Sequence, residues 1–269
     1  MNMFALGPAL LFCPADRPER FAGALAKADA VILDLEDAVL PDAKAQARAN
    51  IIAADVDPAR VIVRVNAPAT EDFAADLDAL GQTPFRTVMV AKTEDPGALD
   101  AFGAGYDLLA LCETARGILH AGRIAAHPQV AGLMWGAEDL VASLGGTSSR
   151  FPDGRYRDVA RAARSQVLLA AGAYERAAID AVHLDIGDLD GLAAEATDAA
   201  ASGFRATACI HPSQVATIRA AYRPADDAVA WARAVLTAAD GERGVFRFEG
   251  RMIDEPVLQH ARSLIERAG

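Results

Sequence analysis

Short hydrophobic runs recur along the chain, and several of them end at a charged or polar side chain. The runs are rich in Val, Ile, Leu and Ala and do not alternate with polar residues, which is typical of strands buried on both faces of a parallel sheet. Helix-like segments separate the runs. The pattern is clearest in residues 30–37, 60–66, 87–92, 108–114 and 130–139.

Strand-like and helix-like segments alternate in eight units up to residue 222. Eight consecutive units are what a closed (β/α)8 barrel of roughly 250 residues needs. The alternation also fits a doubly wound sheet, but the chain lacks the GxGxxG turn that is typical of that fold. We therefore predict an α/β protein with a (β/α)8 TIM barrel in residues 1–222.

Residues 223–269 lie beyond the eight units and show a different pattern. Residues 225–241 predict an amphipathic helix, residues 244–256 a short β-like or loop segment, and residues 257–269 a terminal helix. This C-terminal extension either packs on the barrel wall or serves as a lid and an oligomer contact within the same structural unit.

The charged side chains at the ends of the hydrophobic runs are the candidate functional groups. A buried charge without a partner is costly, so these groups should share one polar cavity. The carboxyl ends of barrel strands surround a single active site, which provides such a cavity. The group comprises Glu36, Asp37, Arg64, Lys92, Glu113 and Asp139.

Glu113 and Asp139 are candidate metal ligands, because they follow two strands that are neighbours in a barrel. Two carboxylates, completed by waters and substrate oxygens, are a common way to hold Mg²⁺. A carboxylate pair suits Mg²⁺ better than zinc. The alternative is that both residues cap helices, since each is close to a predicted helix start.

Each of the other charged residues admits two interpretations. Glu36 and Asp37 either orient metal-bound waters or cap the next helix. Arg64 lies in a buried run and needs an anion, either a substrate carboxylate or an internal partner such as Glu36 or Asp37. Lys92 has the same two alternatives. For Arg64 we favour contact with the substrate.

Two histidines and an aspartate lie near the last two predicted strands. His183 and Asp185 alternate on one face of a strand, and His211 ends the next one. Such a set could bind a metal or transfer protons. A histidine that hydrogen-bonds to the backbone at a strand end is the more common arrangement, and we predict that arrangement here.

Composition narrows the class of partner. The formal net charge of −11 argues against nucleic acid, whose binding surface would be basic. An anionic small molecule stays compatible, because a basic pocket can lie inside an acidic protein. Three scattered cysteines without CxxC spacing predict reduced, buried thiols and a cytoplasmic location. No apolar run approaches the roughly 20 residues of a membrane-spanning helix, so we expect no membrane partner.

Several motifs occur in a fixed order between Leu11 and Leu264 and together resemble a known family. The motifs are LFCPADRPERF, VILDLEDAV, RVNAP, VAKTED, ETARGI, WGAEDL, CIHPSQV and RMIDEPVL. They resemble the stand-alone citrate lyase β-subunit-like proteins of the HpcH/HpaI aldolase and citrate lyase superfamily. The resemblance implies a (β/α)8 barrel, Mg²⁺ dependence with Mn²⁺ as an alternative ion, and carbon–carbon bond chemistry next to a CoA or acyl-carrier thioester.

The resemblance also implies a role for the matching residues. Glu113 of ETARG and Asp139 of GAEDL match the metal ligands of the family. Arg64 of RVNAP matches the arginine that binds the carboxylate of a keto acid or hydroxy acid. Glu36 and Asp37 match the acidic pair near the metal-bound waters.

The C-terminal motif has a further implication. Asp254 matches an acidic residue that, in related CoA lyases, reaches the active site of a neighbouring subunit. The resemblance therefore implies a homo-oligomer, expected to be a trimer, with Asp254 as a catalytic residue. The chain departs from many relatives where an Arg-Ser pair precedes the first strand. Here it has GPAL, so we do not expect the substrate contact that this arginine makes in those relatives.

The resemblance predicts an oxo-acid lyase that cleaves a 3-hydroxyacyl-CoA to acetyl-CoA and a keto acid. The expected substrate is of the citramalyl-, malyl-, citryl- or 3-hydroxy-3-methylglutaryl-CoA type. Lys92 and Arg64 are the residues expected to contact it. The alternatives are a metal-dependent aldolase acting on free hydroxy-keto acids, and an enzyme that also hydrolyses the thioester, as malate synthase does. A non-catalytic subunit of a larger complex is less favoured, because Glu113, Asp139 and Arg64 are all present.

Overall fold

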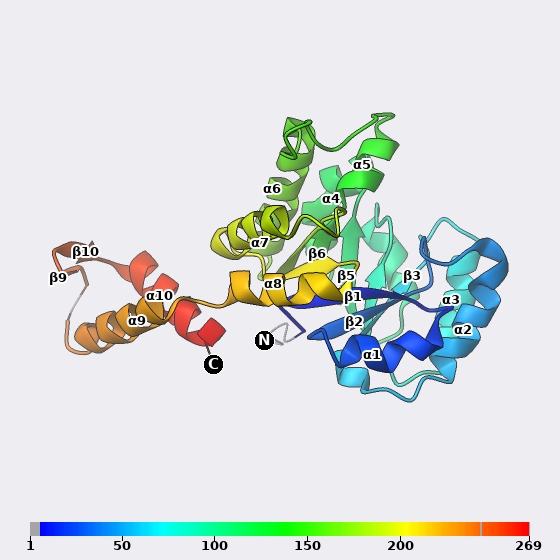
Figure 1. Cartoon of the computed structure of the whole chain (residues 1–269), viewed down its shortest axis with the longest axis horizontal. Coiled ribbons are helices and arrows are strands. Elements are labelled where there is room, and N and C mark those ends of the chain that lie inside the picture. Colours follow the sequence, from blue (N-terminus) through cyan, green and yellow to red (C-terminus); the bar gives the residue numbers. More distant parts are fainter. Residues whose placement is uncertain (1–5, 243, 269) are drawn as a thin grey trace. The chain divides into compact units, whose positions relative to one another are not determined.

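The structure is a computed structural model that describes residues 6–242 and 244–268. Eight parallel strands pair in sequence order and close into a barrel, with β8 next to β1, and helices surround it (Figure 1). The predicted (β/α)8 fold is confirmed. The strands are β1 (Ala9–Pro14), β2 (Ala30–Asp34), β3 (Val61–Val65), β4 (Thr87–Val90), β5 (Asp107–Cys112), β6 (Val130–Trp135), β7 (Ala177–Asp180) and β8 (Ala206–Cys209).

Helices follow the strands in the predicted order. The connection after β4 differs from the expected helix, because it forms only a 3₁₀ segment that Asp95 caps by accepting the N–H of Gly97; 3₁₀ turns commonly serve as short connectors. The α-helices are α1 (Phe21–Leu25), α2 (Lys44–Ile52), α3 (Asp72–Leu80), α4 (Ala115–Ala125), α5 (Ala137–Ser143), α6 (Asp158–Ala173), α7 (Leu189–Ser202) and α8 (Val215–Tyr222). The 3₁₀ segments are η1 (Pro18–Arg20), η2 (Pro41–Ala43), η3 (Pro58–Arg60), η4 (Pro96–Ala101) and η5 (Pro212–Gln214).

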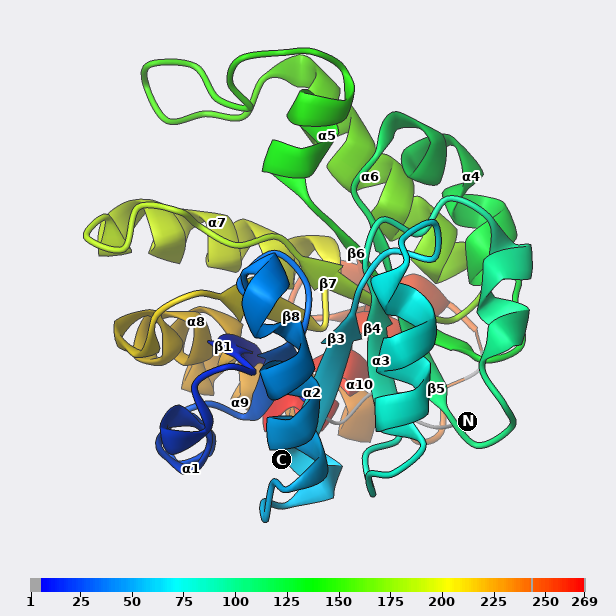
Figure 2. The same ribbon diagram turned by 90° about the vertical axis from the view of Figure 1, so that its right-hand side faces the viewer.

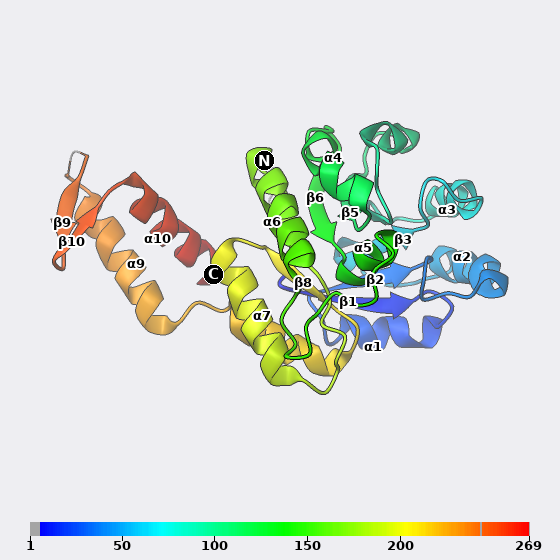
Figure 3. The same cartoon turned by 90° about the horizontal axis from the view of Figure 1, so that it is seen from above.

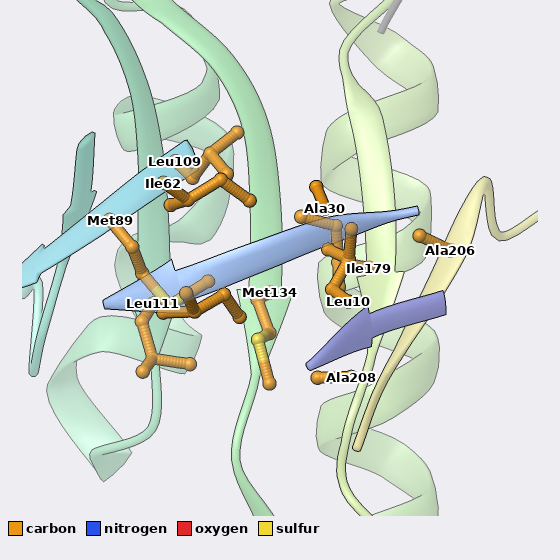
Figure 4. Packing of buried hydrophobic residues seen from close by; sticks show 11 residues of the cluster. Leu10, Ala30, Ile62, Met89, Leu109, Leu111, Met134, Ile179, Ala206 and Ala208 are labelled. Carbon is orange, nitrogen blue, oxygen red and sulfur yellow. The ribbon is translucent and has the colours of Figure 1, made fainter. Parts of the chain in front are cut away.

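The barrel interior is a packed apolar core to which every strand contributes. Figure 4 shows Ile62, Met89, Leu109, Leu111 and Met134 gathered on one side, and Leu10 and Ile179 with the small Ala30, Ala206 and Ala208 on the other. Apolar side chains of different size thus fill the interior, as is usual in such barrels. The core consists of Leu10, Ala30, Ile32, Ile62, Met89, Leu109, Leu111, Met134, Ile179, Ala206 and Ala208. Because the interior is filled, any site must lie at the strand ends.

A buried polar network ties α2 and α3 to the ends of β2 and β3. The two helices lie side by side outside the barrel (Figure 2). Asp76 of α3 accepts hydrogen bonds from Arg48 Nε at 2.7 Å and from the backbone N–H of Asn66 at 2.8 Å. Lys44 Nζ donates to Asn66 Oδ1 at 2.7 Å and to the carbonyl of Glu36 at 3.1 Å. The helices therefore hold the loops that carry candidate site residues.

The chain divides into two compact units, one ending at Ile218 and the other beginning at Arg219. The second unit contains α9 (Asp226–Ala239), β9 (Phe246–Phe248), β10 (Arg251–Ile253) and α10 (Glu255–Ala268). Figure 3 shows α9 and α10 side by side, with the antiparallel β9–β10 hairpin between them in sequence. The unit has its own small core of Ala232, Val235, Ile253, Leu258 and Ala261.

Among residues 6–242 and 244–268, no helix combines the length and the apolar composition that a bilayer span requires.

Candidate active site

A pocket of about 340 Å³ lies at the carboxyl ends of the barrel strands. Its wall contains one guanidinium, from Arg64, among several carboxylates. The apolar part of the wall includes Phe12 of β1, Leu111 of β5 and Met134 of β6. The carboxylates belong to Asp34, Asp37, Glu113, Glu138 and Asp139. The pocket thus combines acidic groups that suit a cation with a single strong anion-binding group.

Arg64 is held by a partner that the sequence analysis did not name. It is opposite Asp34 in the β2–β3 register, and its Nε and Nη2 donate to the two Asp34 oxygens at 2.7 and 2.6 Å. A third nitrogen, Nη1, lies 3.0 Å from Glu36. Burial opposes the charge of Arg64, but the Asp34 and Glu36 carboxylates outweigh it and raise the pKa of the guanidinium. The internal ion pair therefore exists, and its carboxylates come from Asp34 and Glu36.

The ion pairs fix the plane of the Arg64 guanidinium without using all of its N–H groups. The side chain also packs over the Phe12 ring, with Cζ 4.9 Å from the ring centroid. Arg64 lines the pocket, so its remaining donors are available to an anion there. A guanidinium fixed on two sides is well prepared for bidentate binding of a carboxylate.

Lys92 connects the carboxylates around the pocket. Its ammonium pairs with Glu36, lies 3.0 Å from Asp37 Oδ2 and 3.5 Å from Asp139 Oδ1. Burial opposes the charge, but hydrogen bonds to Glu36 and Asp37 raise the pKa of Lys92. The backbone N–H of Lys92 donates to Glu113 Oε1 at 3.0 Å. Lys92 therefore contacts four of the predicted site residues at once.

The pKa values of Glu36 and Asp37 are shifted in opposite directions. Burial raises the pKa of Glu36 even though Arg64 and Lys92 oppose the shift. The side chain of Asp37 is more exposed than that of Glu36. Burial disfavours the charged form of Asp37, but the pKa of this carboxyl is lowered, chiefly by the hydrogen bond from Lys92. Asp37 thus stays a carboxylate at the mouth, while Glu36 is the buried link between Arg64 and Lys92.

Glu113 is a deeply buried acid at the carboxyl end of β5, with 3% of its surface exposed. Burial, and then the negative charge of Asp139, raise the pKa of Glu113 to about 8 despite Arg64 and Lys92. The N-cap of α4 is Thr114, whose hydroxyl accepts the N–H of Gly117. The alternative that Glu113 caps this helix is therefore wrong. Asp139 lies in the first turn of α5, whose N-cap is Gly136.

The pair of Glu113 and Asp139 fits a divalent cation. The negative charge of Asp139 opposes ionisation of Glu113, and a cation bound by both carboxylates would remove that repulsion. Within the described residues, no three His, Cys, Asp or Glu side chains are grouped as a metal cage. A cation held by the two carboxylates of Glu113 and Asp139 would keep open positions for water or substrate oxygens, as Mg²⁺ commonly does.

His183 and His211 have different surroundings. His211 accepts the backbone N–H of Ser213 through Nδ1 and caps η5, so the predicted backbone bond is confirmed there. For His183 that prediction is wrong. Its Nδ1 bonds to Glu195 at 2.9 Å, and Nε2 lies 3.3 Å from Asp188. The reason is that α7 brings Glu195 back over the end of β7, which the sequence spacing does not reveal.

The segment between α5 and α6 is fixed by polar contacts. The Ser149 hydroxyl donates to Glu138, which precedes Asp139 in the pocket wall. Arg150 pairs with both oxygens of Glu195 and stacks on the Tyr156 ring at 3.7 Å from its centroid. Glu195 has no hydrophobic-run signal in the sequence, so its place beside the pocket could not be predicted.

Asp254 is the only predicted site residue in the second unit. Its Oδ1 accepts the backbone N–H of Val257 at 3.3 Å, and its carbonyl accepts that of Leu258, so it precedes the first turn of α10. Its catalytic role stays a prediction. The other predicted residues, Glu36, Asp37, Arg64, Lys92, Glu113 and Asp139, lie together in the barrel unit.

Comparison with known proteins places this pocket in a family. Residues 9–212 match the HpcH/HpaI aldolase/citrate lyase family. The chain belongs to this family. A citrate lyase subunit beta-like protein of Mycobacterium tuberculosis strain H37Rv is 56% identical over 100% of this chain and 98% of its own length. A crystal structure of CitE from Mycobacterium tuberculosis in complex with magnesium, acetoacetate and coenzyme A is 56% identical, with a TM-score of 0.93 over 99% of this chain and 100% of that one.

A more distant member of the family has a different named activity. A (3S)-malyl-CoA thioesterase of Cereibacter sphaeroides strain ATCC 17023 is 34% identical over 90% of this chain and 87% of its own length. The family as a whole contains aldolases and lyases, and this chain is a lyase-type member. The family membership and the barrel agree with the resemblance seen in the sequence motifs.

Proposed function

We propose that this protein is a Mg²⁺-dependent carbon–carbon lyase that cleaves a 3-hydroxyacyl-CoA thioester to acetyl-CoA and a keto acid. The observation that carries the proposal is the pocket in which the buried Glu113 and the partly exposed Asp139 line the same space as Arg64. The first group suits a divalent cation and the second an anionic carboxylate. The CitE complex with magnesium, acetoacetate and coenzyme A supports the same chemistry for this chain.

Glu113 and Asp139 would hold the cation, which when bound polarises the hydroxyl and carboxylate oxygens of the substrate. Arg64 binds the substrate carboxylate with the N–H groups that Asp34 and Glu36 leave unused. The Phe12 ring and its apolar neighbours form the wall beside that carboxylate. A small apolar substituent on the reacting carbon fits such a wall.

The bond-breaking step needs a base. The base removes the proton of the substrate hydroxyl, the carbon–carbon bond breaks, and its electron pair passes to the thioester fragment as an enolate. Protonation of that enolate gives acetyl-CoA, while the former hydroxyl oxygen becomes the keto group of the other product. We assign the base to Asp254 of a second copy in a homotrimer, which rests on the RMIDEP motif.

Glu36, Asp37 and Lys92 support the site electrostatically. Their ion pairs balance the negative carboxylates around the pocket with the positive charge of Lys92, and Asp37 is exposed enough to orient water.

We also propose a cytoplasmic location, because the cysteines are buried within strands, where disulfide chemistry has no access.

The test uses the purified protein with Mg²⁺ and four thioesters: malyl-, citramalyl-, citryl- and 3-hydroxy-3-methylglutaryl-CoA. Mass spectrometry follows acetyl-CoA, with EDTA as the control. We expect EDTA-sensitive release of acetyl-CoA from at least one thioester. We also expect its loss in a Glu113→Gln variant that still folds. Metal-independent cleavage, or full activity of Glu113→Gln, would refute the proposal.

Hydrolysis of the thioester is the second candidate function, favoured by the similarity to the (3S)-malyl-CoA thioesterase. The same reactions distinguish the two, because hydrolysis releases free CoA whereas cleavage alone does not. Activity on free hydroxy-keto acids, without any thioester cleavage, would instead indicate an aldolase.

A further inference from the structure

We infer that the backbone of Lys92 and the missing side chain of Gly136 act together to position the Glu113 carboxylate. The N–H of Lys92 donates a hydrogen bond to Glu113 Oε1, and the absence of a side chain on Gly136 leaves the space that Glu113 Oε2 occupies. The inference rests on the proposed metal role of Glu113. It makes Lys92 and Gly136 positioning residues whose main chains set the affinity of the site for a divalent cation.

Lys92 has a backbone conformation that is unusual for a residue with a side chain. Its φ angle is +48°, in the left-handed region that favours glycine. Residues held in such conformations persist only where the surroundings fix them. Here the result is an N–H at the end of β4 that donates to Glu113 Oε1, across to the end of β5, at 3.0 Å.

The side chain of Lys92 explains how this backbone is held. Its ammonium is anchored by Glu36 and lies 3.0 Å from Asp37 Oδ2. The same ammonium lies 3.5 Å from Asp139, the other proposed ligand. Losing these ion pairs would leave a strained residue without its anchor, so the N–H would turn away from Glu113.

Gly136 provides the opposite wall. It follows β6 and is the N-cap of α5. A Cβ on Gly136 would lie 2.8 Å from Glu113 Oε2 and 2.9 Å from Glu113 Cβ. The carboxylate alone could rotate away from such a contact, but the Cβ of Glu113 is attached directly after β5 and cannot. Any side chain at this position therefore displaces Glu113 as a whole.

The first experiment compares Gly136→Ala with Gly122→Ala. Gly122 lies in α4, where an added Cβ meets no atom within 4 Å, so it is a matched control for adding one methyl group. Mn²⁺ binding is measured by electron paramagnetic resonance, with Mg²⁺ as a competitor. We expect Gly136→Ala to bind Mn²⁺ about 10- to 100-fold more weakly than the control, the range typical for groups that orient metal ligands.

The second experiment compares Lys92→Gly with Lys92→Ala. Both variants lose the ammonium and have the same net charge, so the electrostatic effect on a bound cation cancels. Glycine adopts the left-handed conformation freely and keeps the N–H on Glu113, whereas alanine relaxes out of it. We expect Lys92→Ala to bind Mn²⁺ at least about fivefold more weakly than Lys92→Gly.

Circular dichroism and thermal unfolding establish that each variant is folded. If Gly136→Ala does not fold, the Lys92 pair decides the question. Equal Mn²⁺ affinities of Lys92→Ala and Lys92→Gly, or a Gly136→Ala affinity within about twofold of the control, would overturn the inference while the proposed function stands. Failure of the unaltered protein to bind Mn²⁺ or Mg²⁺ would overturn both.

Discussion

Replacing Asp34 with alanine tests the central ion pair of the pocket. The Asp34 side chain is fully buried, and the Arg64 side chain is 10% exposed. Asp34 accepts both Arg64 bonds and the backbone N–H groups of Glu36 and Ala38. Removing one partner of a buried pair leaves the other charge uncompensated and costs about 3–5 kcal/mol. Because Glu36 lies 3.0 Å from Arg64 and still compensates part of its charge, we expect the loss of unfolding free energy to be at the lower end of that range.

The assay is urea unfolding followed by circular dichroism, with Asp78→Ala as the control. Asp78 is an exposed aspartate on α3, so its replacement should change the free energy of unfolding by less than about 0.5 kcal/mol. The double variant Asp34→Ala/Arg64→Ala removes both charges and should be more stable than the sum of the single effects predicts. A loss below about 1 kcal/mol in Asp34→Ala would refute the reasoning, because it would mean that the buried Arg64 needs no Asp34.

Further predictions concern the cluster around Glu195. The hydrogen bond to Glu195 raises the pKa of His183, although burial acts in the opposite direction. Protonated His183 therefore stabilises the fold fully below its unfolded pKa of about 6.5. That stability is lost as the pH rises through the higher pKa of the folded state. We therefore expect the difference in unfolding free energy between the unaltered protein and His183→Gln to fall as the pH rises through that window. A difference that does not change with pH would contradict this. Arg150→Lys loses the bidentate pair with Glu195 and the planar stacking on Tyr156. We expect a loss of about 1–2 kcal/mol in thermal unfolding and faster proteolysis of residues 145–157; unchanged values would count against this role of Arg150.

The positions of the candidate site residues could be predicted because they depend on local patterns. Apolar runs without alternation indicate buried parallel strands, and the strand ends of a barrel meet on one face. Glu113 and Arg64 therefore had to lie near each other once eight units were counted. Glu36 could be named as a possible partner of Arg64, but Asp34 could not, since a strand pattern says which face a residue occupies but not which residue of the next strand is opposite.

The sequence by itself determined the barrel, the order of its strands and the face on which the charged residues gather, because hydrophobic periodicity is encoded residue by residue. Tertiary structure alone decided that Arg64 pairs with Asp34 rather than with Asp37, through the register of β2 and β3. It also decided that α7 brings Glu195 to His183 and that Gly136 leaves room for Glu113. These contacts join residues that are distant in sequence, and their choice depends on distances of a few tenths of an ångström that no single segment specifies.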